Sequence, residues 1–357
     1  MKYMVRVVAT LLLACNVCAL HYGRRHHKVR GELPVEAEVV VWVDEAGQTI
    51  GIENHAPTAT IPPAQATDLP PILIVPDPDS LLVPEIPTED DPPEPENVTP
   101  NRKFGISYSP YNDDRTCKSQ ERVDKDMEAV SEHEYVRIYG IDCNQTETVL
   151  AAAKKQNMQV FAGIFNLEGF PDSLETIMDA AAGDWSPFHT IAIGNELVNG
   201  KHNSAEEVVQ AVHTARGRLR DAGYEGPVVT VDTFSVMLKH PELCHASDYC
   251  AANCHAFFDA NQTPEKAGAY ARKQAKQVSD AAGGKKTLIT ESGWPHGGQP
   301  NGAAIPSKEN QQKAISSLRE TFGDNGDLVL FTAFDDGWKE DNQWTFGAEK
   351  FWGIQNP

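Results

Sequence analysis

The sequence predicts an α/β protein whose main domain is a closed (β/α)₈ TIM barrel, preceded by a disordered linker rich in proline and acidic residues. Three observations lead to this prediction. Residues 103–357 contain eight short apolar runs of β-favouring residues. Amphipathic helical segments separate these runs, and helices between consecutive strands are typical of a parallel sheet with right-handed crossovers. Eight such units in about 250 residues match the size of a closed barrel.

The expected strands are each four to six residues long. In chain order they cover residues 104–108, 135–139, 159–164, 190–194, 228–231, 249–253, 287–290 and 328–331. Helical periodicity is clearest at 204–220, 264–281 and 307–320. An open, doubly wound sheet is the alternative arrangement, but the sequence offers no glycine-rich phosphate loop to support it.

The N-terminal segment 1–19 has the pattern of a secretory signal peptide. Lys2 and Arg6 precede an apolar stretch at 7–13, and small residues allow cleavage after Ala19. A transmembrane anchor is the alternative, but the apolar run is too short and is interrupted by Asn16. We therefore expect a secreted protein with no membrane partner.

Residues 20–102 are not expected to form a packed domain. The basic stretch at 21–30 is interpreted either as a propeptide-processing site or as a disordered basic tail. Residues 56–100 hold 13 of the 24 prolines, and residues 31–100 hold 15 Asp or Glu and no Lys or Arg. Because proline removes backbone donors and like charges repel, this part is expected to be an extended linker with one strand-like piece at 39–44.

The charge of the chain is concentrated in that linker. Of the formal net charge of −20, the linker contributes −15, which leaves −5 for the remainder. A nucleic-acid partner needs a basic face for its phosphates, so we expect none.

Five cysteines would remain after removal of the signal. They are Cys117, Cys143, Cys244, Cys250 and Cys254. Secretion favours disulfides, and an odd number leaves at least one thiol unpaired. We expect a Cys117–Cys143 bridge because both residues follow adjacent strands, while the pairing of the other three stays open. A metal site made by those three with His245 and His255 is the alternative, but the spacing matches no established zinc pattern.

Secretion would also expose the chain to N-glycosylation. Three Asn-X-Thr sequons begin at Asn97, Asn144 and Asn261. A sequon is necessary and not sufficient, so their occupancy stays open.

Two of the expected strands end in a glutamate. The string Ile-Gly-Asn-Glu at 193–196 closes the fourth strand, and Thr-Glu-Ser-Gly-Trp-Pro at 290–295 closes the seventh. Barrels of this kind carry their catalytic groups at the C-terminal ends of the strands. A charge directly after a buried strand is also costly unless it is used. We therefore expect Glu196 and Glu291 to face each other across a groove.

Paired carboxyl groups suit the hydrolysis of glycosidic bonds. One protonated acid helps the leaving oxygen to depart, and the other group, ionised, attacks or assists. Repulsion between the two would raise the pKa of one of them, which suits the acid. Because two carboxyl groups suffice, no metal and no organic cofactor is expected.

The two motifs resemble the signatures of glycoside hydrolase family 17, which contains β-1,3-glucan endohydrolases and, in fungi, glucanosyltransferases. The resemblance covers about residues 103–354, and the string Phe-Thr-Ala-Phe-Asp-Asp-Gly-Trp-Lys at 331–339 is similar to the fungal branch of secreted cell-wall proteins. It implies a retaining (β/α)₈ enzyme in which Glu196 is the acid/base and Glu291 is the nucleophile. It also implies that Asn195 contacts the sugar 2-hydroxyl. The expected partner is β-1,3-glucan, acted on by a monomer.

The chain departs from the family pattern in the eighth strand. Relatives often carry glutamate where this sequence has Thr332 and Asp336. Either Asp335 or Asp336 is expected to hydrogen-bond a glucose hydroxyl.

A glucan cleft also needs aromatic side chains on which sugar rings can stack. Aromatic residues that follow or end the expected strands are Tyr108, Tyr111, Tyr139, Phe257, Phe258, Trp294, Trp338 and Trp344. Each of them can instead be a core residue. A cleft position is favoured for Tyr139 and Trp294, and neither position is favoured for Phe257 and Phe258.

Two further polar residues are candidates for the site. Arg137 lies in a strand whose neighbours are apolar, and a buried arginine needs a carboxylate partner, so we expect it to orient Glu291. A surface ion pair is the alternative. His255 follows the sixth strand, and it is expected either to contact Glu291 or the sugar or to be a structural histidine.

Two other functions stay open. A non-catalytic glucan-binding protein of the cell wall, such as an adhesion protein, would require a damaged carboxyl pair. A glycosidase of the same clan that acts on cellulose or mannan would fit the strand-end residues, but the Ser-Gly-Trp-Pro string at 292–295 argues against it. Hydrolysis and sugar transfer share the covalent intermediate, so the sequence does not separate them.

Overall fold

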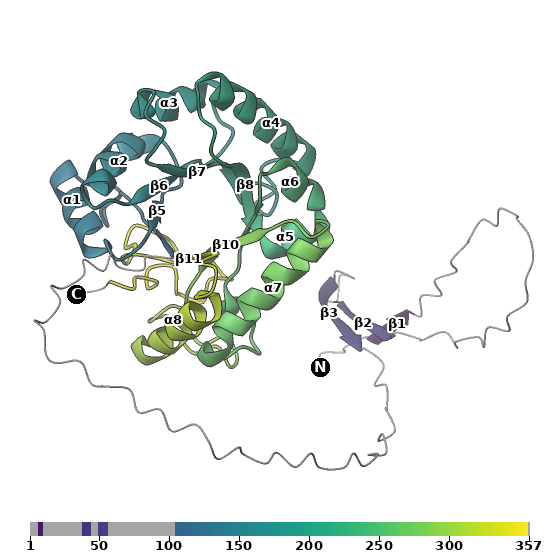
Figure 1. Ribbon diagram of the computed structural model, residues 1–357. Coiled ribbons are helices and arrows are strands. Elements are labelled where there is room, and N and C mark those ends of the chain that lie inside the picture. The colour runs from purple at the N-terminus through teal and green to yellow at the C-terminus, as the bar shows by residue number, and fades with distance from the viewer. Residues whose placement is uncertain (1–5, 10–37, 44–48, 56–103, 356–357) are drawn as a thin grey trace, which may run out of the picture. The chain divides into compact units, whose positions relative to one another are not determined.

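The computed structural model describes residues 6–9, 38–43, 49–55 and 104–355, and the chain divides into two units, Met1–Asp90 and Asp91–Pro357 (Figure 1). The described part of the first unit is an antiparallel sheet in the order β1-β2-β3. Its strands are β1 (Arg6–Ala9), β2 (Glu38–Val43) and β3 (Thr49–His55).

That sheet has three strands, whereas the sequence predicts only one strand in the N-terminal region. The strand-like piece at 39–44 is present as β2, whereas β1 falls inside the predicted export signal and β3 was not expected. The processing site and the proline-rich part of the linker lie outside the described residues, so those interpretations stay predictions.

Within residues 104–355, eight parallel strands form a closed barrel in the order β10-β11-β4-β5-β6-β7-β8-β9 (Figure 1). The strands are β4 (Gly105–Ser107), β5 (Tyr135–Arg137), β6 (Gln159–Ile164), β7 (Phe188–Asn195), β8 (Val228–Thr233), β9 (Cys250–Asn253), β10 (Thr287–Ser292) and β11 (Leu328–Leu330). Each coincides with an expected run to within two residues at either end. The predicted (β/α)₈ barrel is therefore confirmed, and the open sheet is excluded.

Helices connect the strands on the outside of the barrel. They are α1 (Gln120–Ala129), α2 (Gln145–Lys155), α3 (Glu175–Ala181), α4 (Ala205–Asp221), α5 (Phe234–Lys239), α6 (Pro241–Ala246), α7 (Ala267–Ala281) and α8 (Lys308–Phe322). The start of α4 shows why the sequence begins a helix there. The Ser204 hydroxyl accepts the Glu207 N–H, and the Glu207 carboxylate accepts the Ser204 N–H, which completes a capping box.

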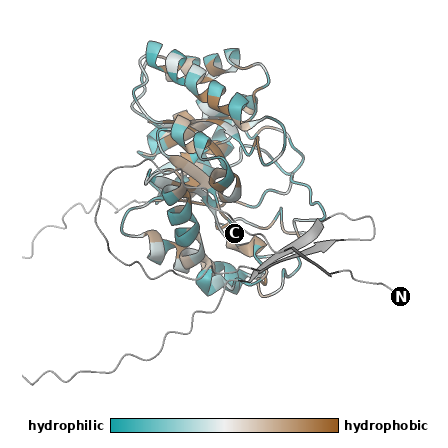
Figure 2. Cartoon of the chain, turned by 90° about the vertical axis from the view of Figure 1, so that its right-hand side faces the viewer, coloured by the Kyte–Doolittle hydropathy of each residue, from teal (hydrophilic) through white to brown (hydrophobic). Residues whose placement is uncertain are grey.

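Alternation along the strands divides their side chains between two apolar layers. Tyr135, Phe161 and Val229 belong to a cluster that fills the barrel, while Val136 and Val228 belong to the larger cluster shared with the helices. Figure 2 shows the helices with both hydrophilic and hydrophobic segments, as amphipathic helices around a barrel require. This double packing holds the strand ends at fixed positions.

Two disulfides lie in the barrel unit. Cys117 and Cys143 are bonded, which confirms the expected pair and joins the segments that follow β4 and β5. Cys244 and Cys250 form the second bridge, and Cys254 is a buried free thiol. Because two of its ligands are paired with each other, the alternative metal site at these cysteines is not formed.

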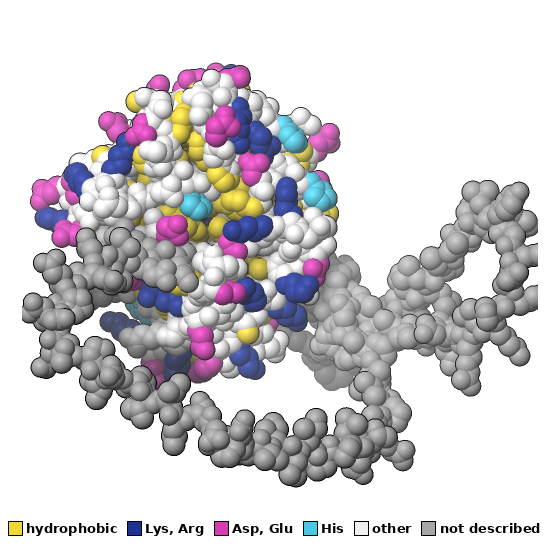
Figure 3. Space-filling model, viewed as in Figure 1, with side chains coloured by type: hydrophobic (Ala, Val, Ile, Leu, Met, Phe, Trp, Pro, Cys, Tyr) yellow, Lys and Arg dark blue, Asp and Glu magenta, His cyan; other side chains and the backbone are white. Residues whose placement is uncertain are grey.

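The surface of the barrel unit carries both signs of charge. On the face shown in Figure 3, Lys and Arg are interspersed with Asp and Glu, and hydrophobic side chains gather near the middle. Among the residues that the structure describes, no helix has the length and apolar character needed to cross a membrane.

The half-buried His189 makes the stability of the barrel depend on pH. The His189 ring stacks on Tyr135 with a centroid separation of 3.9 Å, and its Nδ1 lies 2.9 Å from Thr190 Oγ1. Burial, with a smaller contribution from Lys286, lowers the pKa of His189 to about 4. Burial lowers the pKa of His133 as well.

We predict that the free energy of unfolding decreases as the pH falls from about 6.5 to about 4. In this window the unfolded chain binds a proton at His189 and the folded chain does not, so each pH unit costs up to about 1.4 kcal/mol. Urea unfolding at several pH values measures this slope, and His189→Gln should flatten it. His213→Gln, at an exposed position of α4, is the control and should leave the slope unchanged. An equal slope in wild type and His189→Gln would contradict the prediction.

Candidate active site

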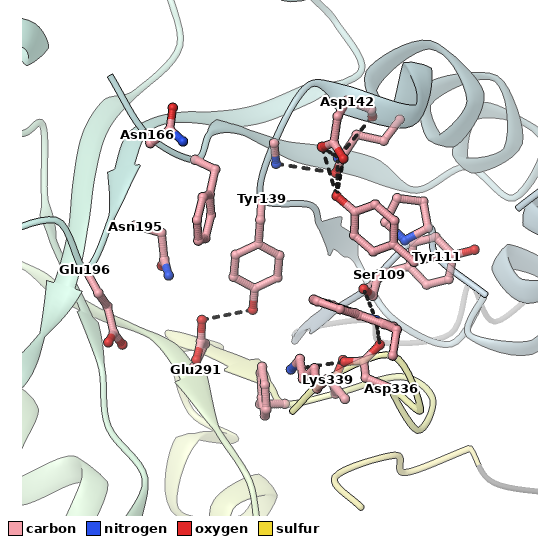
Figure 4. Close-up of a pocket in the computed structure, with 18 of the residues that line it drawn as sticks. Ser109, Tyr111, Tyr139, Asp142, Asn166, Asn195, Glu196, Glu291, Asp336 and Lys339 are labelled. Carbon is pink, nitrogen blue, oxygen red and sulfur yellow. Dashed lines mark hydrogen bonds and ion pairs between the residues drawn. The ribbon is translucent and has the colours of Figure 1, made fainter. Parts of the chain in front are cut away.

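A cleft of about 980 Å³ opens at the C-terminal ends of the barrel strands (Figure 4). Residues that end or follow seven of the eight barrel strands line it, and β8 contributes none of the described lining residues. Glu196, from the end of β7, and Glu291, from β10, both line the cleft and project into the same space in Figure 4. The two predicted carboxyl groups are therefore brought together.

Two amides hold the carboxyl group of Glu196. Asn253 donates to its Oε1 at 2.8 Å, and Asn199 donates to its Oε2 at 3.1 Å. Burial raises the pKa of Glu196, and the negative charge of Glu291 raises it further. This environment favours the protonated form.

Glu291 has the opposite environment although it is more deeply buried, with 6 % of its surface exposed. Arg137 Nη1 and the Tyr139 hydroxyl donate to its Oε1 at 3.0 and 2.9 Å, and His255 Nε2 lies 3.1 Å from its Oε2. Burial alone would raise the pKa of Glu291. The hydrogen bond from His255 and the charge of Arg137 outweigh that effect and lower it to about 2. Glu291 is therefore ionised.

Arg137 connects most of the site. Its Nη1 also donates to Thr290 O at 2.7 Å and to Asn253 Oδ1 at 3.3 Å, and its Nη2 donates to Asn195 Oδ1 at 2.8 Å. The side chain is buried, so the expected contact with Glu291 is present and the surface ion pair is excluded.

The other expected site residues divide between the cleft and its surroundings. Those that line the cleft are Tyr108, Tyr111, Tyr139, Asn195, His255, Phe258, Asp336 and Trp338. Among them, Asp336 accepts from the indole N–H of Trp338 at 3.0 Å and pairs with Lys339 at 3.1 Å. Tyr108 is almost fully buried, and its hydroxyl donates to Asp126 at 2.8 Å.

Trp294 does not lie in the cleft, contrary to the expectation. Its side chain is fully buried, its indole N–H donates to Ile305 O at 3.0 Å, and its ring packs edge-on against Phe257. The neighbouring Gly293 explains the local chain path, because a Cβ at that position would approach Phe331 O to 2.0 Å. The Ser-Gly-Trp-Pro string therefore packs β10 against β11 and the core.

Asp335 also lies away from the cleft lining. Its carboxylate is 3.0 Å from His296 Nε2 and accepts the Gly353 N–H at 2.8 Å. It therefore anchors the C-terminal segment, and Asp336 alone of the two aspartates faces the cleft.

Asn253 was missed at the sequence level. It ends β9, donates to Glu196 and accepts from Arg137, and it is buried. Its signal is a polar residue at the end of an apolar strand, which is the same signal that identified Glu196.

Residues 105–353 match the family model for the BtgE/BtgC glycoside hydrolase domain. The chain belongs to this family. The resemblance to glycoside hydrolase family 17 is thereby confirmed.

Relatives of this family from yeasts are closely similar. A probable family 17 glucosidase, SCW10, from Saccharomyces cerevisiae is 46% identical over 253 residues, which is 70% of this chain and 64% of the relative. The cell surface mannoprotein MP65 from Candida albicans is 45% identical over 70% of this chain and 66% of its own length. The chain thus spans slightly less than two thirds of these relatives.

Solved structures show the same fold. A family 17 β-1,3-glucanosyltransferase from Rhizomucor miehei superposes with a TM-score of 0.59 at 22% identity, covering 70% of this chain and 92% of the other. An active-site mutant of the Rhizomucor enzyme in complex with laminaritriose gives a TM-score of 0.58 at 23% identity, with the same coverage.

We predict that Arg137→Met lowers the free energy of unfolding by about 3–5 kcal/mol, because it leaves the Glu291 carboxylate buried without a cationic partner. Urea unfolding measures the loss. The double variant Arg137→Met/Glu291→Gln should lose less than the two single variants together. Lys125→Met breaks the exposed pair with Glu121 and should change stability by no more than about 0.5 kcal/mol. Strict additivity of the two site substitutions would contradict the inferred coupling.

Proposed function

We propose that this protein is a secreted, retaining glycoside hydrolase that acts on the β-1,3-glucan of cell walls, by internal hydrolysis, by glucanosyl transfer, or by both. The observation that carries the proposal is a pair of cleft carboxyl groups with opposite pKa shifts, Glu196 upward and Glu291 downward. An acid and a nucleophile for the two halves of a double displacement need that difference. The names of the family 17 relatives support the substrate class.

In the first step, Glu291 attacks the anomeric carbon while Glu196 gives its proton to the glycosidic oxygen. The bond between the anomeric carbon and that oxygen breaks, and the shortened glucan leaves as an alcohol. In the second step, Glu196, now ionised, takes a proton from water or from a sugar hydroxyl, whose oxygen displaces Glu291. Water gives hydrolysis, and a sugar hydroxyl gives transfer.

The surrounding groups prepare Glu291 for this attack. Arg137, Tyr139 and His255 keep it ionised and fix its orientation. Asn195, which Arg137 orients through its Oδ1, faces the cleft and is assigned to the sugar 2-hydroxyl. Asp336 and Trp338 are assigned to further glucose units. The protein is proposed to work as a monomer without a metal or organic cofactor.

The cell wall is the proposed location. The relative from Candida albicans is named as a cell surface protein, and the N-terminal sequence has the pattern of an export signal. Products longer than the substrate, detected by chain length over time, would demonstrate transfer, and shorter products alone would demonstrate hydrolysis.

We predict that Glu196→Gln and Glu291→Gln each abolish product formation from laminari-oligosaccharides, whereas Glu225→Gln, at an exposed residue outside the cleft, retains full activity. Azide separates the two roles when an activated aryl β-glucoside is the substrate. With Glu291→Gly, azide enters the vacated face and should give the α-glycosyl azide. With Glu196→Ala, azide attacks the glycosyl-enzyme and should give the β-glycosyl azide. The reverse stereochemistry would exchange the roles, and binding of glucan by a wild type without turnover would favour the non-catalytic alternative.

We also predict that Glu291→Gln lowers the pKa of Glu196. The negative charge of Glu291 raises that pKa, so its neutralisation removes a repulsion and makes Glu196 a stronger acid. A ¹³C NMR titration of the glutamate carboxyl carbons, assigned with Glu196→Gln, measures the change. In the wild type, the fall of kcat/KM at alkaline pH should occur at the pKa of Glu196, because activity is lost when Glu196 gives up its proton. An unchanged titration of Glu196 would contradict the coupling.

A further inference from the structure

The turn after β7 holds Glu196 in an uncommon backbone conformation. Its φ of 55° lies in the left-handed region, which costs a non-glycine residue about 1–3 kcal/mol. Main-chain bonds flank the residue: the Glu196 N–H donates to Val231 O at 2.9 Å, and the Gly200 N–H donates to Glu196 O at 2.8 Å. Such a conformation persists where the surroundings fix it, so the turn at 197–200 must itself be held.

Asp232, near the end of β8, holds that turn. Its Oδ2 accepts the N–H groups of Val198 and Asn199 at 3.0 and 3.4 Å, and its Oδ1 accepts the Thr233 N–H at 2.8 Å. The residue is 2 % exposed and is not among the cleft-lining residues. Burial of a carboxylate is costly unless its oxygens accept hydrogen bonds, and here three backbone N–H groups donate to it, two of which belong to the turn.

Asn199 continues the connection to the carboxyl group of Glu196. Its backbone N–H binds Asp232, and its side-chain amide donates to Glu196 Oε2 at 3.1 Å. Glu196 is thus fixed at its backbone by β8 and at its carboxyl by an amide whose own position depends on Asp232.

We propose that Asp232 is a positioning residue for Glu196, which fixes the turn at 197–200 and thereby aims the Glu196 carboxyl group at the glycosidic oxygen. The inference rests on the proposed role of Glu196 as the acid/base. Asp232 itself does not touch the substrate. Its effect should appear in proton transfer and not in glucan binding.

The negative charge of Asp232 also supports the role of Glu196 as an acid, because it raises the pKa of Glu196. Burial and Glu291, on β10, raise the pKa of Glu196 most strongly, and Asp232, on β8, adds to the increase. From the β9 side, the Asn253 hydrogen bond and the charge of His255 lower it. Asp232 therefore helps to keep Glu196 protonated as well as oriented.

The test compares two substrates in the Asp232→Asn variant. Cleavage of a laminari-oligosaccharide needs a proton from Glu196, whereas the dinitrophenolate of 2,4-dinitrophenyl β-laminaribioside leaves without one. We expect kcat/KM to fall about 10- to 100-fold for the oligosaccharide and to stay within about threefold for the aryl substrate. The alkaline limb of the oligosaccharide profile should also move to lower pH, because the negative charge that raises the pKa of Glu196 is gone.

Asp248→Asn is the matched control. Asp248 accepts the Val228 N–H at 2.6 Å at the opposite end of the same strand, so its substitution affects β8 without reaching the turn. It should leave the ratio of the two kcat/KM values and the alkaline limb unchanged. Should Asp232→Asn fail to fold, Asn199→Ala tests the same connection from the turn side, with the same selective loss expected.

Equal losses on both substrates, or activity equal to wild type with an unmoved alkaline limb, would overturn the proposal. Glu196→Gln is measured in parallel to separate this failure from failure of the proposed function. If that variant loses the oligosaccharide activity selectively while Asp232→Asn does not, the positioning role alone is wrong. If Glu196→Gln keeps its oligosaccharide activity, the acid/base assignment falls, and the positioning role falls with it.

Discussion

The contact between Arg137 and Glu291 inside the barrel is the interaction on which the site depends. A guanidinium group in an apolar barrel is costly, and it is retained here because its donors reach Glu291, Thr290 O, Asn253 and Asn195. These acceptors come from β7, β9 and β10, so one side chain from β5 ties together strands that are distant in sequence. The position of the Glu291 carboxylate and the packing of the strands at this end of the barrel therefore both depend on Arg137.

The hydrogen-bonding partners at this end of the barrel also give the two carboxyl groups opposite pKa shifts. Cationic and hydroxyl donors surround Glu291, whereas neutral amides and two neighbouring carboxylates surround Glu196. Burial acts to raise the pKa of both groups, so burial alone does not distinguish them. The distinction comes from the partners, which is why the substitution of a partner is expected to affect the chemistry even when the carboxyl group itself is unchanged.

Much of the fold follows from periodicity, because every barrel strand is a short apolar run bounded by a helix. The position of Glu196 and Glu291 at strand ends, and a lone arginine in an apolar strand, also identify the centre of the site. The sequence fails where a side chain's direction depends on the tertiary path of the backbone. Trp294 turns into the core because Gly293 brings β10 close to Phe331, and no local pattern reveals that approach.

Polar residues in the second half of the barrel were harder to interpret for a related reason. Asn253 and Asp232 resemble ordinary strand-end residues, and their partners lie about 57 and 34 positions away in sequence. Likewise β3 was missed because Gly51, Glu53 and Asn54 interrupt its apolar pattern, and its pairing with β2 is a non-local property.

One wall of the cleft is cross-linked by the Cys117–Cys143 disulfide, whereas the wall that carries Glu196 is held by hydrogen bonds. It joins the segments after β4 and β5, where Tyr111 also donates to Asp142 at 2.7 Å, so that wall is closed covalently. The turn that carries Glu196 is held by hydrogen bonds to Asp232 instead. An inhibitor designed for this groove should therefore be matched closely to the cross-linked wall, and any added bulk belongs on the side of the turn after β7, where the wall can be reshaped without breaking a covalent bond.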